Sequence, residues 1–118
     1  MSRSSGIRVA RVYDPPTDGD GTRVLVDRLW PRGVSKADAR VDEWPKELTP
    51  SGELRKEFHA GGLTDTEFRA RYAAELAAPE AAEALARLRA LAADGPVTLL
   101  TAVKDPAHSH VSVLLDHL

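Results

Sequence analysis

Cysteine is absent from this chain of 118 residues. Its absence excludes disulfide bonds, thiolate nucleophiles, and zinc or iron–sulfur centres held by cysteine. The sequence also has no glycine-rich phosphate loop of either common pattern and no Gly-x-Ser-x-Gly nucleophile motif. The most familiar nucleotide-binding loops and the serine-hydrolase elbow are therefore missing too.

Long apolar runs and an excess of positive charge are also missing. No window approaches the roughly 20 apolar residues that cross a bilayer, and no stretch of signal-peptide length follows the first residues. The formal net charge is -2, and no basic patch is interleaved with aromatic residues, so nothing draws the chain to nucleic acid or anionic membranes. We expect a cytoplasmic protein without a membrane partner, nucleic acid is a disfavoured partner, and the oligomeric state stays open.

The residues that are present suit one folded domain. Hydrophobic residues make up 42% of the chain and charged residues 29%, which is typical of an ordered domain with a wetted surface, and the length is near that of one domain. Residues 1–6 are small and polar and are expected to form a flexible tail. Residues 7–118 are expected to form a single α/β domain.

Three segments have the pattern of β-strands: residues 7–12, 23–30 and 97–103. The first alternates apolar and basic residues, which is typical of a strand near a sheet edge. The other two contain apolar runs that favour burial on both faces of a sheet. We therefore expect Val24–Val26 and Val97–Val103 to be central, adjacent, parallel strands. A short loop separates the first two strands, so their own pairing is open between parallel and antiparallel.

Helices are predicted between the second and third strands. A short helical turn and then a short strand near Val41 are expected within residues 35–43. Ser51 is a candidate N-cap, and Thr64 with Glu67 forms a candidate capping box for a second helix. A further alanine-rich helix is expected to begin at Pro79 and to stop at Gly95.

The order of these elements predicts the fold class and the place of a site. Asp105 is expected to cap a terminal helix whose first residue is Pro106. Strands alternating with helices predict an α/β fold with a small, mostly parallel sheet and helices on both faces, Rossmann-like and contained in one domain. Ligands of such sheets bind beyond the carboxyl ends of the strands, so the site is expected where strands 23–30 and 97–103 end.

Cationic and aromatic residues follow these strand ends. Arginine grips phosphate or carboxylate with two hydrogen bonds, and a helix N-terminus adds backbone donors. The candidate ligand-binding residues are Arg28, Trp30, Arg32 and Lys104. The alternative is structural: Arg28 could pair with a neighbouring acid, and Arg32 could simply stack on the Trp30 indole.

An acid and two histidines are the candidate catalytic residues at the same place. Asp27 could orient an arginine or act as a base, and His108 or His110 could transfer a proton. The structural alternatives are an ion pair between Asp27 and Arg28, and solvated or capping histidines. On a helix, the two histidines would point about 200° apart, a poor geometry for chelating one metal. We expect neither a metal nor another cofactor.

Three strings of residues carry a family likeness. They are Val24-Leu25-Val26-Asp27-Arg28-Leu29-Trp30-Pro31-Arg32-Gly33; Glu43-Trp44 with Pro50-Ser51 and Leu54-Arg55-Lys56-x-Phe58-His59; and Gly95-Pro96-Val97-Thr98-Leu99-Leu100 with Lys104-Asp-x-x-His108-x-His110. With them the chain resembles the YeaO-like branch of the domain of unknown function 488 (DUF488) family, from Ile7 to Leu118. The resemblance implies a compact α/β fold and a shared signature but no activity.

The chain departs from that family at several positions. A longer branch typically has a cysteine-containing stretch after the equivalent strand, followed by Cys-His-Arg. This sequence has Thr101 and Ser109 where those cysteines would fall, and Val111 in place of the arginine. The YeaO-like branch usually has arginine near Lys104 and asparagine near Ser109. These departures from the family pattern argue against thiol or metal chemistry in this chain.

Two classes of function follow from these residues. The first is binding of an anionic small molecule, phosphate-bearing compounds included, at the strand ends, with catalysis left undecided. The alternative is a protein-interaction or regulatory module in which the strand-end residues are structural, and nucleic-acid binding is less favoured than either. Neither composition nor spacing identifies a reaction or a substrate.

Overall fold

The computed structural model describes residues 7–106 and 109–118. The predicted tail, residues 1–6, and the catalytic candidate His108 lie outside the described residues. No helix in the described part of the chain is long and apolar enough to cross a lipid bilayer.

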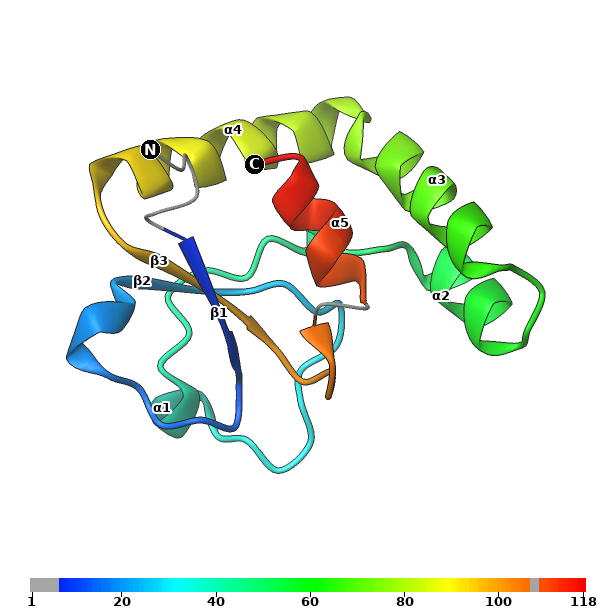
Figure 1. Cartoon of the computed structure of the whole chain (residues 1–118). Coiled ribbons are helices and arrows are strands. Elements are labelled where there is room, and N and C mark those ends of the chain that lie inside the picture. The colour runs from blue at the N-terminus through cyan, green and yellow to red at the C-terminus, as the bar shows by residue number, and fades with distance from the viewer. Residues whose placement is uncertain (1–6, 107–108) are drawn as a thin grey trace.

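A three-stranded parallel sheet forms the centre of the described structure (Figure 1). Its strands are β1 (Ile7–Arg11), β2 (Thr22–Leu25) and β3 (Val97–Thr101), in the order β1-β3-β2. The predicted parallel pairing of the second and third strands is confirmed, with Leu25 opposite Leu100. The first two strands do not pair with each other, because β3 lies between them.

One part of the strand prediction is wrong, since β2 lies at an edge of the sheet and not at its centre. β3 takes the central position, and all five of its residues are buried. The outer side of β2 forms only an isolated parallel bridge, from Val24 to Glu43. This bridge is what the structure has in place of the strand expected near Val41. It explains why the run Val24–Val26 is as apolar as a central strand, since the segment after α1 covers the outer edge of β2.

Helices occupy the connections at the predicted places. Their bounds are α1 (Lys36–Ala39), α2 (Gly52–His59), α3 (Asp65–Leu76), α4 (Pro79–Asp94) and α5 (His110–Asp116), with short 3₁₀ turns at Asp18–Asp20 and Lys46–Leu48. The Ser51 side chain accepts a hydrogen bond from the Leu54 N–H, as expected of an N-cap. Thr64 and Glu67 form the predicted capping box of α3.

The predicted start of the terminal helix is wrong. α5 begins at His110, and its N-cap is Ser109, whose hydroxyl oxygen accepts from the Val111 N–H. Asp105 lies too far upstream to cap this helix. Aspartate and serine are comparably good caps, so contacts elsewhere decide between them. The Ser109 hydroxyl also donates to the Pro106 carbonyl, which ties the cap to the preceding turn.

Hydrophobic residues pack on both faces of the sheet, but unequally. One face, with Val24, Val97 and Leu99, packs against α2, α3, α4 and α5. The opposite face, with Leu25 and Leu100, packs against α1 and the segment that carries the two tryptophans. Figure 1 shows the long helices on one side of the sheet and α1 on the other. The α/β fold with helices on both faces is confirmed, although one face carries only this four-residue helix.

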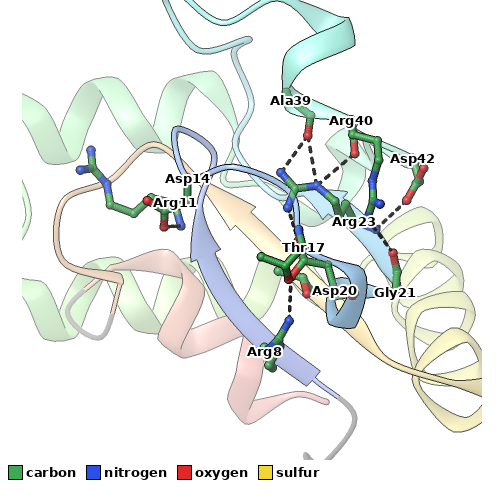
Figure 2. Close-up of polar contacts among 11 residues, drawn as sticks. Arg8, Arg11, Asp14, Thr17, Asp20, Gly21, Arg23, Ala39, Arg40 and Asp42 are labelled. Carbon is green, nitrogen blue, oxygen red and sulfur yellow. Dashed lines mark hydrogen bonds and ion pairs between the residues drawn. The ribbon is translucent and has the colours of Figure 1, made fainter.

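A buried ion pair closes the amino ends of the strands (Figure 2). Arg23, at the start of β2, is 1% exposed, and its Nη1 lies 2.5 Å from Asp20 Oδ2. Its remaining hydrogen bonds go to the carbonyls of Ala39 and Arg40. Asp20 also accepts from Arg8, and from the N–H and hydroxyl of Thr17. This cluster joins β1, β2 and the end of α1 at one edge of the sheet.

Candidate ligand-binding cavity at the strand ends

Where the strands end, at the edge of the sheet opposite the Asp20–Arg23 pair, the contacts are built around Asp27. Because Leu25 lies opposite Leu100 in the register, Asp27, two residues after β2, falls beside Ala102, the residue that follows β3. Its Oδ2 accepts from the Ala102 N–H at 2.7 Å, and its Oδ1 accepts from the Thr101 hydroxyl at 2.7 Å. The Asp27 carbonyl accepts from the Trp44 indole at 2.7 Å. The side chain is therefore fixed across the two strand ends.

His110, the first residue of α5, is held above this strand end. Its Nε2 lies 2.8 Å from the Val26 carbonyl oxygen and 3.2 Å from Asp27 Oδ1. A carbonyl oxygen can only accept, so Nε2 carries a proton. Among the described residues Nδ1 has no hydrogen-bond partner. The imidazole is therefore oriented by its Nε2 and keeps the other nitrogen for a further contact.

The Asp27 carboxylate is stabilised in its charged form. Burial by itself would raise the pKa of Asp27, but hydrogen bonds from His110, the Ala102 N–H and the Thr101 hydroxyl outweigh it and lower the pKa. Both carboxylate oxygens are occupied by donors. An acid of this kind is a weak proton acceptor, so the geometry suits Asp27 to holding His110 in place.

Arg28 and the tryptophans form the next part of the strand end. No ion pair joins Asp27 to Arg28 in the described residues, and Arg28 Nη1 donates instead to the Thr49 hydroxyl at 3.2 Å. The Trp30 indole N–H donates to the Val34 carbonyl at 2.7 Å, and its ring meets Trp44 edge-on at 5.4 Å between centroids. These contacts fix the tryptophan rings.

A cavity of about 650 Å³ opens at this edge of the sheet. Of the residues predicted from the sequence, Asp27, Arg28, Trp30, Arg32 and His110 line it. Lys104 is exposed and is not among the lining residues. The structure thus gathers most of the predicted residues around one cavity, from the end of β2 and the start of α5.

Sequence reasoning missed the contribution of α2 and of the loop after β1. Arg55, Phe58 and His59 of α2 line the cavity, as does Tyr13 from the loop. The three α2 residues are spaced i, i+3 and i+4, so they share one face of the helix. That spacing was a usable signal, but only packing shows that this face meets the strand ends.

Three carboxylates and three arginines line the cavity, and they differ in whether the chain provides them with a partner of opposite charge. Its carboxylates all have partners: Asp27 as above, Asp65 in an exposed ion pair with Arg69, and Asp105. The arginines that line it are Arg28, Arg32 and Arg55. Among the described residues none of these three forms a salt bridge with an acid. The cavity therefore presents cationic groups whose charge no described acidic side chain pairs.

A second cavity of about 430 Å³ lies between α4 and the segment after α1. Its rim is acidic, with Glu47, Glu80 and Glu83, and a salt bridge from Arg87 to Glu43 crosses it. None of the candidate catalytic or ligand-binding residues predicted from the sequence is among its lining residues. In the part of the chain that the structure describes, no three histidine, aspartate or glutamate side chains gather as metal ligands would.

Comparison with models of protein families identifies the family to which this chain belongs. A family model described as the inactive DUF488-N3 subclade matches residues 6–118. The chain belongs to this family. The resemblance to DUF488 proteins inferred from the sequence strings is thereby confirmed. Every strand and helix described above lies within the matched range.

Two relatives place the chain among YeaO-like DUF488 proteins. It is 49% identical over 112 residues to uncharacterized protein YeaO of Escherichia coli, covering 95% of this chain and 96% of that one. It is 46% identical over 114 residues to uncharacterized protein Rv3073c of Mycobacterium tuberculosis, covering 97% and 94%. These names state no activity. No solved structure matches the chain significantly.

Proposed function

We propose that this chain binds a small organic anion in the cavity at the carboxyl ends of the strands. The observation that carries the proposal is the unequal pairing of charges there. The lining carboxylates have partners, whereas Arg28, Arg32 and Arg55 form no salt bridge within the described residues. Arg28 and Arg55 are half-buried, whereas Arg32 is exposed. Partial burial of a guanidinium without an acidic partner is unfavourable, and a carboxylate or phosphate would offset that cost with two parallel hydrogen bonds.

Asp27 and His110 serve recognition in this proposal. Asp27 orients the imidazole, and His110 offers its free Nδ1 to a hydroxyl or acid proton of the ligand. Trp30 forms part of the cavity wall. Lys104 does not line the cavity and contributes only through its charge.

Binding without turnover is the form of this function that we favour. The matching subclade is described as inactive. The positions at which the resembling longer branch has cysteines are Thr101 and Ser109, and both hydroxyls are engaged in structural hydrogen bonds. Neither hydroxyl bonds to the imidazole of His110 in the described contacts, so His110 activates neither of them as a nucleophile there.

Thermal unfolding in the presence of anions tests the proposal. A ligand that binds only the native state raises the melting temperature with its concentration. Phosphate should therefore raise the melting temperature of the wild type more than chloride at matched ionic strength, which controls for salt exclusion. Arg32→Ala and Arg55→Ala should each lose most of this additional rise.

Lys56→Ala is the matched control for these two variants. Lys56 is the exposed neighbour of Arg55 on α2, does not line the cavity and carries the same charge. It should keep the full response to phosphate. An equal response of the wild type, Arg32→Ala and Arg55→Ala would show that the cavity is not the anion site.

A further inference from the structure

The rim of the same cavity carries exposed apolar surface. Among the described residues, Tyr13 and Leu29 are the large hydrophobic side chains that are exposed, at 49% and 64%. Both of them line this cavity. Tyr13 comes from the loop after β1 and Leu29 from the segment after β2, so two separate parts of the chain place apolar groups at one opening.

Aromatic and aliphatic groups continue from the rim into the cavity. Phe58 and Phe68 both line it, and their rings stack at 4.4 Å between centroids. Ala102 and Val103, which follow β3, add to the same lining. Apolar groups therefore accompany the arginines within one space, which inorganic phosphate would leave largely unfilled.

The size of the cavity is that of a site for an organic molecule. Small-molecule sites commonly measure about 300–1,000 Å³ and are mostly apolar, with a few polar groups that fix the orientation of the ligand. At about 650 Å³, this cavity falls in the middle of that range. Its polar groups include the three arginines and the Asp27–His110 pair described above, beside His59, Asp65, Asp105 and Ser109.

We infer that the ligand is amphipathic: an aromatic or branched aliphatic body that carries one carboxylate or phosphate group. This inference rests on the proposed function and narrows it. The anionic group binds the guanidinium groups of Arg28, Arg32 and Arg55. The apolar body contacts Tyr13 and Leu29, and its burial removes from water the side chains that the free protein leaves exposed.

Titration calorimetry with four probes tests the inference on the intact chain. The probes are inorganic phosphate, phenyl phosphate, benzoate and benzyl alcohol. Phenyl phosphate should bind with a Kd roughly tenfold or more below that of inorganic phosphate, because burial of the ring adds apolar contact. Benzyl alcohol, which has the ring without the charge, should bind much more weakly than phenyl phosphate. Benzoate carries a carboxylate in place of the phosphate and so distinguishes the two head groups. If benzoate binds more tightly than benzyl alcohol, a carboxylate can serve as the anionic group of the ligand.

Variants at exposed positions separate the two parts of the ligand. Leu29→Ser and Tyr13→Ser should weaken binding of phenyl phosphate several-fold and leave binding of inorganic phosphate unchanged. Arg55→Ala should weaken both, and Lys56→Ala neither. Both rim side chains are exposed, so their replacement should leave the fold intact, which the melting temperature of each variant checks.

The outcomes distinguish this inference from the proposed function. If phenyl phosphate binds no more tightly than inorganic phosphate, and both depend on Arg55, the anion site stands and the amphipathic ligand is refuted. If neither anion binds, the proposed function fails, and the inference fails with it. If benzyl alcohol binds as tightly as phenyl phosphate, charge plays no part and both are wrong.

Discussion

The sheet holds an aspartate beside a basic side chain both where its strands begin and where they end. These amino-end and carboxyl-end edges differ in what surrounds the pair. At the amino ends, Asp20 and Arg23 are buried, bond to each other (Figure 2) and line neither of the two cavities described above. At the carboxyl ends, Asp27 and His110 are likewise bonded to each other, but they line a cavity of about 650 Å³. Three arginines without acidic partners in the described residues share that cavity.

We propose that the difference separates a structural role at the amino ends of the strands from a binding role at their carboxyl ends. Arg23 donates to Asp20 and to the Ala39 and Arg40 carbonyls, which leaves it little capacity for a ligand. At the carboxyl ends, Asp27 also accepts hydrogen bonds on both carboxylate oxygens, but the arginines around it have no acidic partner among the described residues. An acidic residue beside a basic one therefore indicates a binding site only when groups around it keep unpaired charge.

The largest effect of a substitution is expected at the amino-end edge, which we call closed because its Asp20–Arg23 pair is buried. The carboxyl-end edge, which lines the cavity, is called open. Arg23→Met should destabilise the protein by about 3–5 kcal/mol, because it leaves the buried Asp20 carboxylate without its partner. Urea denaturation would measure the free energy of unfolding. Arg8→Ala is the control, since Arg8 donates to the same carboxylate from a side chain that is 55% exposed, and exposed pairs contribute about 0–1 kcal/mol. Equal losses in the two variants would contradict the structural role of Arg23.

Acid should weaken the same edge by a smaller amount. Hydrogen bonds from the Thr17 N–H and hydroxyl, with help from Arg23 and against the effect of burial, lower the pKa of Asp20 from 3.8 to about 2. A depressed folded-state pKa contributes stability that is complete above the unfolded-state value and is lost as the pH falls through the folded one. The contribution of Asp20 should therefore decline between about pH 4 and pH 2. Titration of its side-chain carboxyl carbon by NMR would test this, and a midpoint near 4 would refute it.

A smaller loss of stability is expected at the open edge. Asp27→Asn should destabilise the protein by about 1–3 kcal/mol, since the amide places an N–H against one of the donors that the carboxylate now accepts from. The side chains of Asp27 and His110 are 15% and 12% exposed, so water relieves part of the mismatch. Denaturation beside Arg23→Met gives the comparison. A loss as large as that of Arg23→Met would mean that both edges are structural.

The sequence predicted the local features that short-range chemistry decides. The Ser51 cap, the Thr64–Glu67 box and the parallel pairing of the two apolar strands all follow from neighbouring residues or from residue type. Asp105 as the helix cap was wrong because Ser109 caps equally well, and the hydrogen bonds of His110 to the end of β2 favour the later start. Such a contact across 84 positions leaves no local pattern.

Two further features, one in the candidate site and one at the amino ends of the strands, depended on packing for the same reason. Arg55 belongs to α2, which begins at Gly52, whereas β2 ends at Leu25, so only the folded chain brings Arg55 to the strand ends. Arg23 lies in a strand where a charged residue suggests exposure, yet it is 1% exposed. The ion pair that permits this comes from the adjacent 3₁₀ turn, and a sequence pattern shows only that an acid is nearby.

The most direct test of the binding cavity is a titration of the isotope-labelled protein with phenyl phosphate, followed by backbone amide NMR. The account predicts that the resonances of Leu29, Arg55, Ala102 and Val103 shift with ligand concentration and saturate together. Those of Asp20 and Arg23 should stay in place and serve as the internal control. Shifts that cluster at Asp20 and Arg23, or that spread over the surface without saturating, would contradict the assignment of the carboxyl edge as the binding site.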